Sequence, residues 1–194
     1  MNKDILQATA TLKQGNLVVY PTDTLYALGA DVFNDAAVRC VFQIKKRPFS
    51  LPLPVAVASY EQMDQISFLT KTARILLNEF LPGALTLVLK KRKVLSDLLT
   101  GNQNTVAVRI PDDIIALRLL DDYGPLTVTS ANIHNEKTPY SVSDIKKIFS
   151  SNISCYLDSG VRMGEPSTIV DCTMDPPKIL RAGSISSDVI LSKV

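Results

Sequence analysis

The sequence predicts an α/β fold, a single domain whose helices pack on a twisted mixed sheet. Segments with apolar residues at helical spacing interleave with short β-branched or alternating runs typical of strands. No repeat or low-complexity linker divides the 194 residues, of which 46% are hydrophobic and 21% charged. This composition is that of an ordinary globular protein, and a chain of this length can bury a core without disulfides. We therefore expect one domain over residues 1–194.

Composition excludes several functional classes. No apolar run approaches the roughly 20 residues that a membrane-spanning helix needs, and residues 1–4 lack the apolar segment of a signal peptide, so we expect a cytoplasmic protein. Cys40, Cys155 and Cys172 are far apart in sequence, which argues against a disulfide framework or a zinc site and predicts small core residues. A single histidine, His134, excludes a two-histidine metal site. The net charge of +2 does not by itself indicate a nucleic-acid binder.

The first elements are predicted to be helix, strand and helix. Residues 2–14 carry apolar side chains at helical spacing, and Gly15 provides a stop signal. The β-branched and aromatic run that starts at Leu17 predicts a buried strand, which Pro21 ends. Residues 34–46 predict a second helix with a polar cap and an apolar stripe.

The middle of the chain continues the alternation. Residues 53–58 predict a strand between prolines, and residues 70–80 predict a helix that Pro82-Gly83 breaks. Residues 83–90 predict a strand with at least one buried face. The next strand is expected over residues 105–110.

This strand at 105–110 carries a functional signal. Its period-2 alternation places Val106 and Val108 on one face, and Thr105, Ala107 and Arg109 on the other. An arginine and a threonine therefore share one face of the sheet.

The last part of the chain predicts six further elements, two helices and four strands. An acidic pair opens a helix over 112–121, and a serine caps another that ends near 149. Strands are expected at 126–130, 154–158, 167–172 and 178–182.

Short polar motifs follow several of these elements. In order they are Pro21-Thr22-Asp23-Thr24, Lys45-Lys46-Arg47-Pro48, Val106-Ala107-Val108-Arg109, Thr129-Ser130-Ala131-Asn132, Ser167-Thr168-Ile169-Val170-Asp171 and Ile179-Leu180-Arg181-Ala182-Gly183. This ordered set resembles the YrdC-like family, the L-threonylcarbamoyladenylate synthases that begin formation of N6-threonylcarbamoyladenosine in transfer RNA. The resemblance runs from about residue 10 to about residue 185.

The resemblance implies both a fold and a reaction. The implied fold is a twisted mixed sheet curved around a deep, positively charged cavity. The implied reaction converts ATP, L-threonine and bicarbonate or CO2 into threonylcarbamoyl-AMP and pyrophosphate, and a separate transferase uses the product. Neither common glycine-rich phosphate loop is present, so side chains must hold the nucleotide. Mg2+ is expected with ATP, held by the triphosphate and water rather than by protein ligands.

The resemblance also implies site residues. The threonine contacts are Thr24, Arg109, Ser130 and Ser167, with Thr22 and Tyr26 lining the same pocket. The ATP contacts are Lys45, Arg47, Thr105, Asn132, Tyr140 and Arg181. Structural explanations stay open for three of them: a turn hydroxyl for Thr24, a helix-dipole partner for Arg47 and a sheet-edge salt bridge for Arg109.

The sequence departs from the family pattern at several places, among them Tyr140, where the family more often has a small hydroxyl residue. Leu51 and Ala56 stand where the family often has an ATP-contacting polar residue and a histidine. After Asn132 the family usually continues Ile-Ser-Gly, whereas this chain has His134 and Asn135, and we expect His134 to be a surface loop residue. Asn135 can adopt the left-handed backbone that glycine would permit.

Two other functions fit parts of the sequence. An RNA-binding module without synthase activity would use the basic clusters at 45–47 and 90–93. A YrdC-like module of the hydrogenase-maturation type would carry zinc-finger and acylphosphatase segments, which this sequence lacks. The combination of Thr24, Arg109, Ser130 and Ser167 favours a threonine pocket over both.

Overall fold

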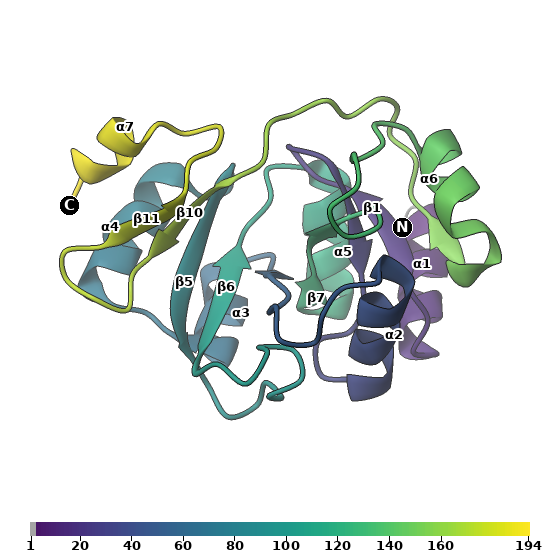
Figure 1. Cartoon of the computed structure of the whole chain (residues 1–194), viewed down its shortest axis with the longest axis horizontal. Coiled ribbons are helices and arrows are strands. Elements are labelled where there is room, and N and C mark those ends of the chain that lie inside the picture. The colour runs from purple at the N-terminus through teal and green to yellow at the C-terminus, as the bar shows by residue number, and fades with distance from the viewer. Residues whose placement is uncertain (1–2) are drawn as a thin grey trace.

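The computed structural model describes residues 3–194, so the first residue of the helix expected over 2–14 lies outside it. Helices surround two β-sheets that stand side by side (Figure 1). The elements are α1 (Lys3–Lys13), β1 (Val18–Pro21), β2 (Tyr26–Gly29), α2 (Asp35–Lys45), β3 (Val55–Ala56), α3 (Tyr60–Ile66), β4 (Ser67–Phe68), α4 (Lys71–Phe80), β5 (Leu85–Lys91), β6 (Thr105–Arg109), α5 (Ile114–Tyr123), β7 (Leu126–Thr127), β8 (Thr129–Ser130), α6 (Val142–Phe149), the 3₁₀ turn η1 (Ser150–Asn152), β9 (Cys155–Tyr156), β10 (Thr168–Asp171), β11 (Lys178–Arg181) and α7 (Ser187–Leu191). None of the helices within residues 3–194 is long and apolar enough to cross a membrane.

Both sheets are mixed. The larger has the strand order β11-β10-β5-β6-β3-β7, with β4 paired to β5, and the smaller has the order β8-β2-β1-β9. The predicted α/β class with a mixed sheet is confirmed, but the expectation of one sheet was wrong. The segment predicted as one strand over 126–130 divides at Val128, with β7 pairing in the larger sheet and β8 in the smaller one. An apolar run does not reveal which of two sheets each half will join.

The first hairpin, β1–β2, positions the Thr22–Leu25 turn at the end of the smaller sheet. Pro21 is the last residue of β1, as predicted, but β2 was not predicted. The Thr22 hydroxyl closes the turn because it donates to the Leu25 carbonyl (2.6 Å) and accepts from the Leu25 N–H (3.2 Å). Gly29 is required opposite β1, since a Cβ there would lie 2.8 Å from the Tyr20 ring.

Strands β5 and β6 form the centre of the larger sheet and separate the core from the cavity. Leu85, Leu87 and Leu89 are buried in the same core cluster as the apolar face of α4. On the opposite face, Thr86 and Val88 of β5 join Thr105, Ala107 and Arg109 of β6 in lining the cavity. The predicted alternation in β6 is therefore confirmed.

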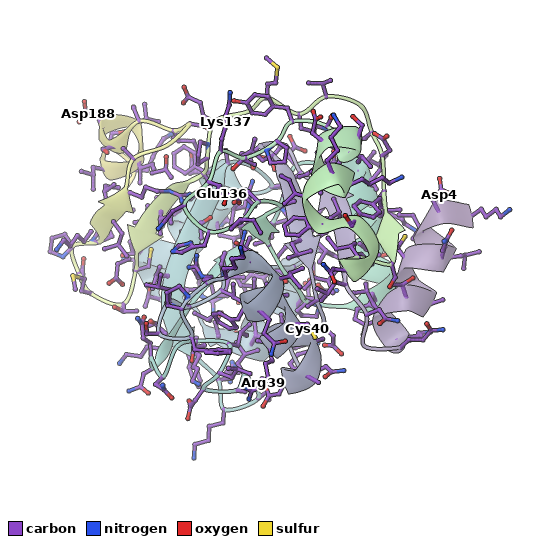
Figure 2. The ribbon with its side chains drawn as sticks, turned by 45° about the vertical axis from the view of Figure 1, so that its right-hand side comes forward. Asp4, Arg39, Cys40, Glu136, Lys137 and Asp188 are labelled. Atoms are coloured by element: carbon purple, nitrogen blue, oxygen red, sulfur yellow. The ribbon has the colours of Figure 1, made fainter. Side chains whose placement is uncertain are left out.

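Besides β2, the short elements α3, β4, η1 and α7 were not predicted. Helix α3 begins after Ser59, whose hydroxyl accepts the Gln62 N–H (3.4 Å). A serine three residues before a glutamine is a capping signal in the sequence that could have revealed this helix. The three cysteines are free thiols, and the expectation that all lie in the core was wrong for Cys40, which is exposed on α2 (Figure 2).

Candidate active site

A cavity of about 460 Å³ lies between the two sheets and is lined by residues from both. Seven of the ten predicted site residues line it: Thr24, Arg47, Thr105, Arg109, Ser130, Ser167 and Arg181. Lys45, Asn132 and Tyr140 do not belong to the lining. Among the lining residues, all within the described part of the chain, three are arginines and none is acidic. The cavity is thus suited to anions.

Arg109 is held rigidly beside Thr24 at the cavity wall. Its Nη2 lies 2.7 and 2.9 Å from the Asp23 carboxylate oxygens and 3.0 Å from the Gly83 carbonyl oxygen, and its Nη1 donates to the Thr24 hydroxyl (3.2 Å). The residue is 4% exposed, and its Nε is buried without a partner among residues 3–194. Burial lowers the pKa of Arg109, and the adjacent Asp23 opposes this shift. A fixed guanidinium of this kind is a good ligand for a carboxylate.

The Thr22–Thr24 turn and Tyr26 line the same side, as expected. The two threonine hydroxyls are 3.0 Å apart. The Tyr26 hydroxyl donates to the Gly160 carbonyl (2.7 Å) and accepts from the Ser159 N–H (2.9 Å), which fixes the orientation of the ring. This side of the cavity is therefore preorganised by hydrogen bonds.

Ser167 and Arg181 line the cavity from the edge of the larger sheet. The Ser167 hydroxyl lies 2.8 Å from the Thr86 hydroxyl, and Arg181 donates to the Ser167 carbonyl (2.7 Å). Burial and the positive charge of Arg109 lower the pKa of Arg181. Thr86 was not among the predicted site residues, although the alternation in its strand placed it opposite the buried leucines.

Arg47 reaches the cavity from the loop after α2. Its Nη2 and Nε donate to the carbonyls of Pro52 (2.9 Å) and Leu51 (3.2 Å), and its Nη1 lies 3.4 Å from His134 Nδ1. Leu51 is one of the positions at which the sequence departs from the family pattern. Its backbone carbonyl nevertheless helps to orient Arg47. Partial burial and the charges of Arg47 and Lys45 lower the pKa of His134, which favours a neutral imidazole that can accept from Arg47.

Lys45 lies behind the cavity wall. The residue is 1% exposed, and its Nζ donates to the carbonyls of Ser130 (2.5 Å) and Asn132 (2.7 Å) and to the Asn132 side-chain oxygen (3.2 Å). Burial and the nearby Arg47 lower the pKa of Lys45 to about 7. Lys45 therefore holds the Ser130–Asn132 loop in place, and its contact with ATP stays a prediction.

Replacing Lys45 by methionine is expected to lower the free energy of unfolding by about 1–3 kcal/mol, because it leaves buried carbonyl groups without a donor. Urea denaturation would measure the change. Lys46→Met, at the exposed neighbouring position, is the matched control and should change stability little. Equal stability of the two variants would contradict a loop-holding role for Lys45.

Asn132 and Tyr140 also lie outside the lining. The Asn132 amide donates to the Glu136 carbonyl (2.6 Å), and its oxygen accepts from the Ser130 hydroxyl (2.6 Å). Tyr140 is exposed, with the Lys137 ammonium 5.9 Å from its ring centre; Figure 2 places Lys137 on the outer surface. Nucleotide contacts by either residue stay predictions. Asn135 has a φ of 65°, so it adopts the left-handed backbone that the sequence analysis expected it to tolerate.

The basic clusters are largely engaged within the protein. In the second cluster Lys91 pairs with Asp97 (2.6 Å) and Arg92 with Asp64 (3.2 Å), while Lys90 and Lys93 are exposed. Within residues 3–194 no group of three or more histidine, cysteine, aspartate or glutamate side chains could hold a metal ion.

Comparison with known proteins gives the family. The Sua5/YciO/YrdC model, described as "Telomere recombination", matches residues 10–183. The chain belongs to the Sua5/YciO/YrdC family. Within it, the threonylcarbamoyl-AMP synthase of Pyrococcus abyssi is 38% identical over 186 residues, which cover 94% of this chain and 55% of that protein. This chain therefore spans about half the length of that family member.

A further relative and a solved structure extend the comparison. The threonylcarbamoyl-AMP synthase of Vibrio vulnificus is 32% identical over 188 residues, covering 94% of this chain and all of that protein. The crystal structure of P. abyssi Sua5 complexed with L-threonine matches with a TM-score of 0.93 and 36% identity, over 98% of this chain and 57% of that one.

Proposed function

We propose that this member of the Sua5/YciO/YrdC family is a threonylcarbamoyl-AMP synthase. It joins L-threonine, bicarbonate or CO2, and ATP to give threonylcarbamoyl-AMP and pyrophosphate, the first step of N6-threonylcarbamoyladenosine formation in transfer RNA. The observation that carries the proposal is one cavity lined by a buried Arg109 beside Thr24 and by two further arginines, Arg47 and Arg181. The relatives' names and the threonine complex of P. abyssi Sua5 support it.

Threonine binds with its carboxylate on Arg109 and its polar groups among the hydroxyls of Thr24, Ser130 and Ser167. The amine must lose a proton before it can attack CO2. None of the described lining residues is acidic, and the nearby Asp23 carboxylate is paired with Arg109. The bound ammonium therefore has no unpaired counter-ion among the lining residues, and Arg47 and Arg181 favour the neutral amine. The electrostatics of the cavity thus prepare the nucleophile.

The chemical step brings two anions together. A carbamate oxygen attacks the α-phosphorus of ATP and the bond to pyrophosphate breaks. Two unit charges about 4 Å apart repel by roughly 4 kcal/mol at an effective dielectric constant of 20. Arg47 and Arg181 reduce this repulsion by binding the phosphates, so positioning and electrostatics provide most of the catalysis.

Mg2+ accompanies ATP in this proposal. The lining offers hydroxyl and carbonyl oxygens without carboxylates, a donor set that does not form a dedicated magnesium site. The ion therefore enters on the triphosphate and keeps water ligands. The labile product then passes to a separate threonylcarbamoyl transferase.

Pyrophosphate release from ATP by the purified protein is expected to require L-threonine, bicarbonate and Mg2+ together, because the attacking group is the carbamate. A coupled pyrophosphate assay with each component omitted in turn would measure it. Release that is independent of threonine would overturn the proposal.

The same preparation tests the RNA-binding alternative. Salt-dependent RNA binding without pyrophosphate release would favour that alternative. The structure disfavours it, since Lys45, Arg47, Lys91 and Arg92 contact other groups of the protein and only Lys46, Lys90 and Lys93 are exposed.

A further inference from the structure

Residues 158–166, here called the strap, connect the two sheets across the top of the molecule (Figure 1). The strap has neither helix nor strand, and it follows β9 of the smaller sheet and precedes β10 of the larger. Its first residues hydrogen bond to Tyr26, and Pro166 at its end lines the cavity. Both ends of the strap therefore adjoin the candidate site.

The middle of the strap lies directly on the threonine side of the cavity. The Gly164 N–H donates to the Thr24 carbonyl (2.9 Å), and a Cβ on Gly164 would lie 2.5 Å from that oxygen. No other residue type could approach the turn so closely. Because Thr24 also receives the Arg109 hydrogen bond, a displaced strap would disturb the group that fixes this arginine.

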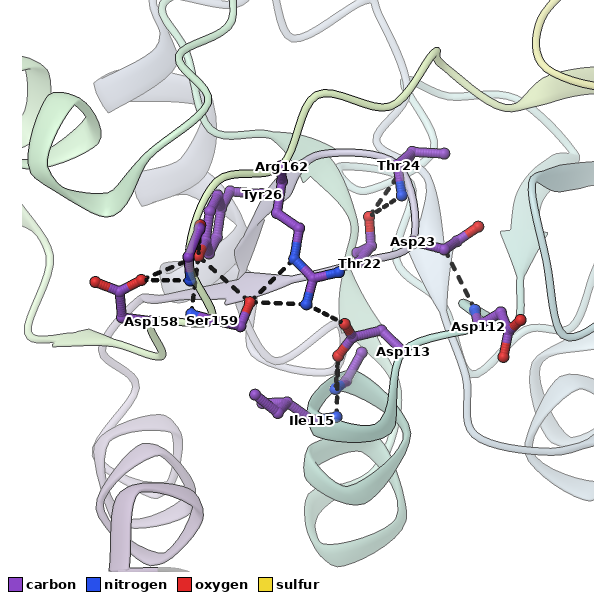
Figure 3. Close-up of polar contacts among 12 residues, drawn as sticks. Thr22, Asp23, Thr24, Tyr26, Asp112, Asp113, Ile115, Asp158, Ser159 and Arg162 are labelled. Atoms are coloured by element: carbon purple, nitrogen blue, oxygen red, sulfur yellow. Dashed lines mark hydrogen bonds and ion pairs between the residues drawn. The ribbon is translucent and has the colours of Figure 1, made fainter.

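Polar contacts, rather than apolar burial, hold the strap. Val161 and Met163 are 65% and 71% exposed. Between them, Arg162 Nη2 lies 2.8 Å from Asp113 Oδ2, and its Nε and Nη2 donate to the Ser159 hydroxyl (3.0 and 2.9 Å), as Figure 3 shows. The Arg162 side chain is thus the main link between the strap and α5.

The two oxygens of the Asp113 carboxylate bind different groups. Oδ1 caps α5 by accepting the N–H groups of Ile115 (2.9 Å) and Ala116 (3.0 Å), while Oδ2 binds Arg162 (Figure 3). The Asp113 side chain is only 5% exposed, so its charge needs the guanidinium as a partner. The strap is therefore tied to a rigid helix end.

We propose that Arg162 is a positioning residue for the threonine side of the cavity: through Asp113 it holds the strap on Thr24, and thereby keeps the Thr22–Thr24 turn in place for the substrate. The turn's role in binding threonine rests on the proposed function. The mechanical part of the inference stands on the contacts alone.

Hydrogen exchange followed by mass spectrometry tests the mechanical part without any activity. Arg162→Met removes the pair and keeps the aliphatic stem, and Asp113→Asn keeps the capping oxygen while removing the charge. Both variants are expected to exchange about tenfold faster than wild type in the strap and at residues 22–25, a factor that corresponds to ~1.4 kcal/mol. Arg118→Met, which breaks the exposed pair with Asp122 on the same helix, is the matched control and should leave both segments unchanged.

Kinetics test the functional part. Arg162→Met is expected to raise the KM for threonine about tenfold with little change in the KM for ATP, and Arg162→Lys should restore part of the loss. The double variant Arg162→Met/Asp113→Asn should be no worse than either single variant, since both remove the same pair.

Each outcome decides the inference. Unchanged exchange at residues 22–25 would overturn it, whether or not the strap itself loosens, and so would faster exchange with an unchanged threonine KM. Faster exchange of both segments with a raised threonine KM supports it. A wild-type protein without threonine-dependent turnover would refute the proposed function, and exchange would still decide whether Arg162 holds the turn.

Discussion

Replacing Arg109 by methionine is expected to raise the KM for threonine tens- to thousands-fold, the range for loss of about 2–5 kcal/mol from a desolvated charged contact. The same change should lower the free energy of unfolding by about 3–5 kcal/mol, because the Asp23 carboxylate would remain poorly solvated without its partner. Threonine titration of pyrophosphate release at saturating ATP would measure the first effect, and urea denaturation the second.

A double variant separates the two roles of Arg109. Arg109→Met/Asp23→Asn removes both charges, so most of the stability should return while the threonine KM stays high. If the threonine KM returned to the wild-type value together with the stability, Arg109 would have only a structural role. This role, as a partner in a salt bridge, is the alternative that the sequence analysis could not exclude.

The position of Arg109 could be predicted from the sequence because a strand has only two faces. Once Val106 and Val108 are assigned to the core, Thr105 and Arg109 must face the other way, and the structure places both at the cavity. Pro21 likewise marks the end of β1 because it has no N–H to donate. Local chemistry decides features of this kind, so sequence patterns reveal them.

Lys45 shows what motif spacing leaves out. The Lys-x-Arg pattern suggested that both cations contact phosphate. The phosphate contact of Lys45 stays a prediction, and the structure places this residue on the buried face of α2 with Val38, Val41 and Phe42. Helical periodicity alone places residues 38, 42 and 45 on one side. If helical periodicity had been applied to Lys45, it would have predicted that this side chain points into the protein. Arg47 lies beyond the end of the helix, so the periodicity does not apply to it.

Long-range pairings could not be predicted. The division of residues 126–130 between two sheets depends on partners at β3 and β2, which no local signal identifies. Arg162 and Asp113 are 49 positions apart in number, and neither belongs to a motif, yet their 2.8 Å contact connects the strap to α5. Such contacts arise from the assembled topology, and only the structure reveals them.

Replacing Arg181 by alanine is expected to lower threonine-dependent pyrophosphate release tens- to thousands-fold, through the loss of about 2–5 kcal/mol of phosphate stabilisation. Its effect on folding should be small. Among the described residues Arg181 donates only to the carbonyl and hydroxyl of Ser167, and hydrogen bonds of this kind contribute about 1 kcal/mol each. Arg181→Ala is thus expected to lower activity with little loss of stability. Lys45→Met is expected to lower the free energy of unfolding.

Two further variants complete the Arg181 test. Arg181→Lys keeps the charge and should recover part of the rate, since a point charge still attracts phosphate but lacks the two-pronged geometry. Lys178→Ala, at an exposed position of the same strand, is the matched control and should leave turnover unchanged. Near-normal turnover in Arg181→Ala would remove Arg181 from the nucleotide side, and Arg47 would then be the remaining arginine at the cavity able to neutralise the phosphates without breaking an ion pair.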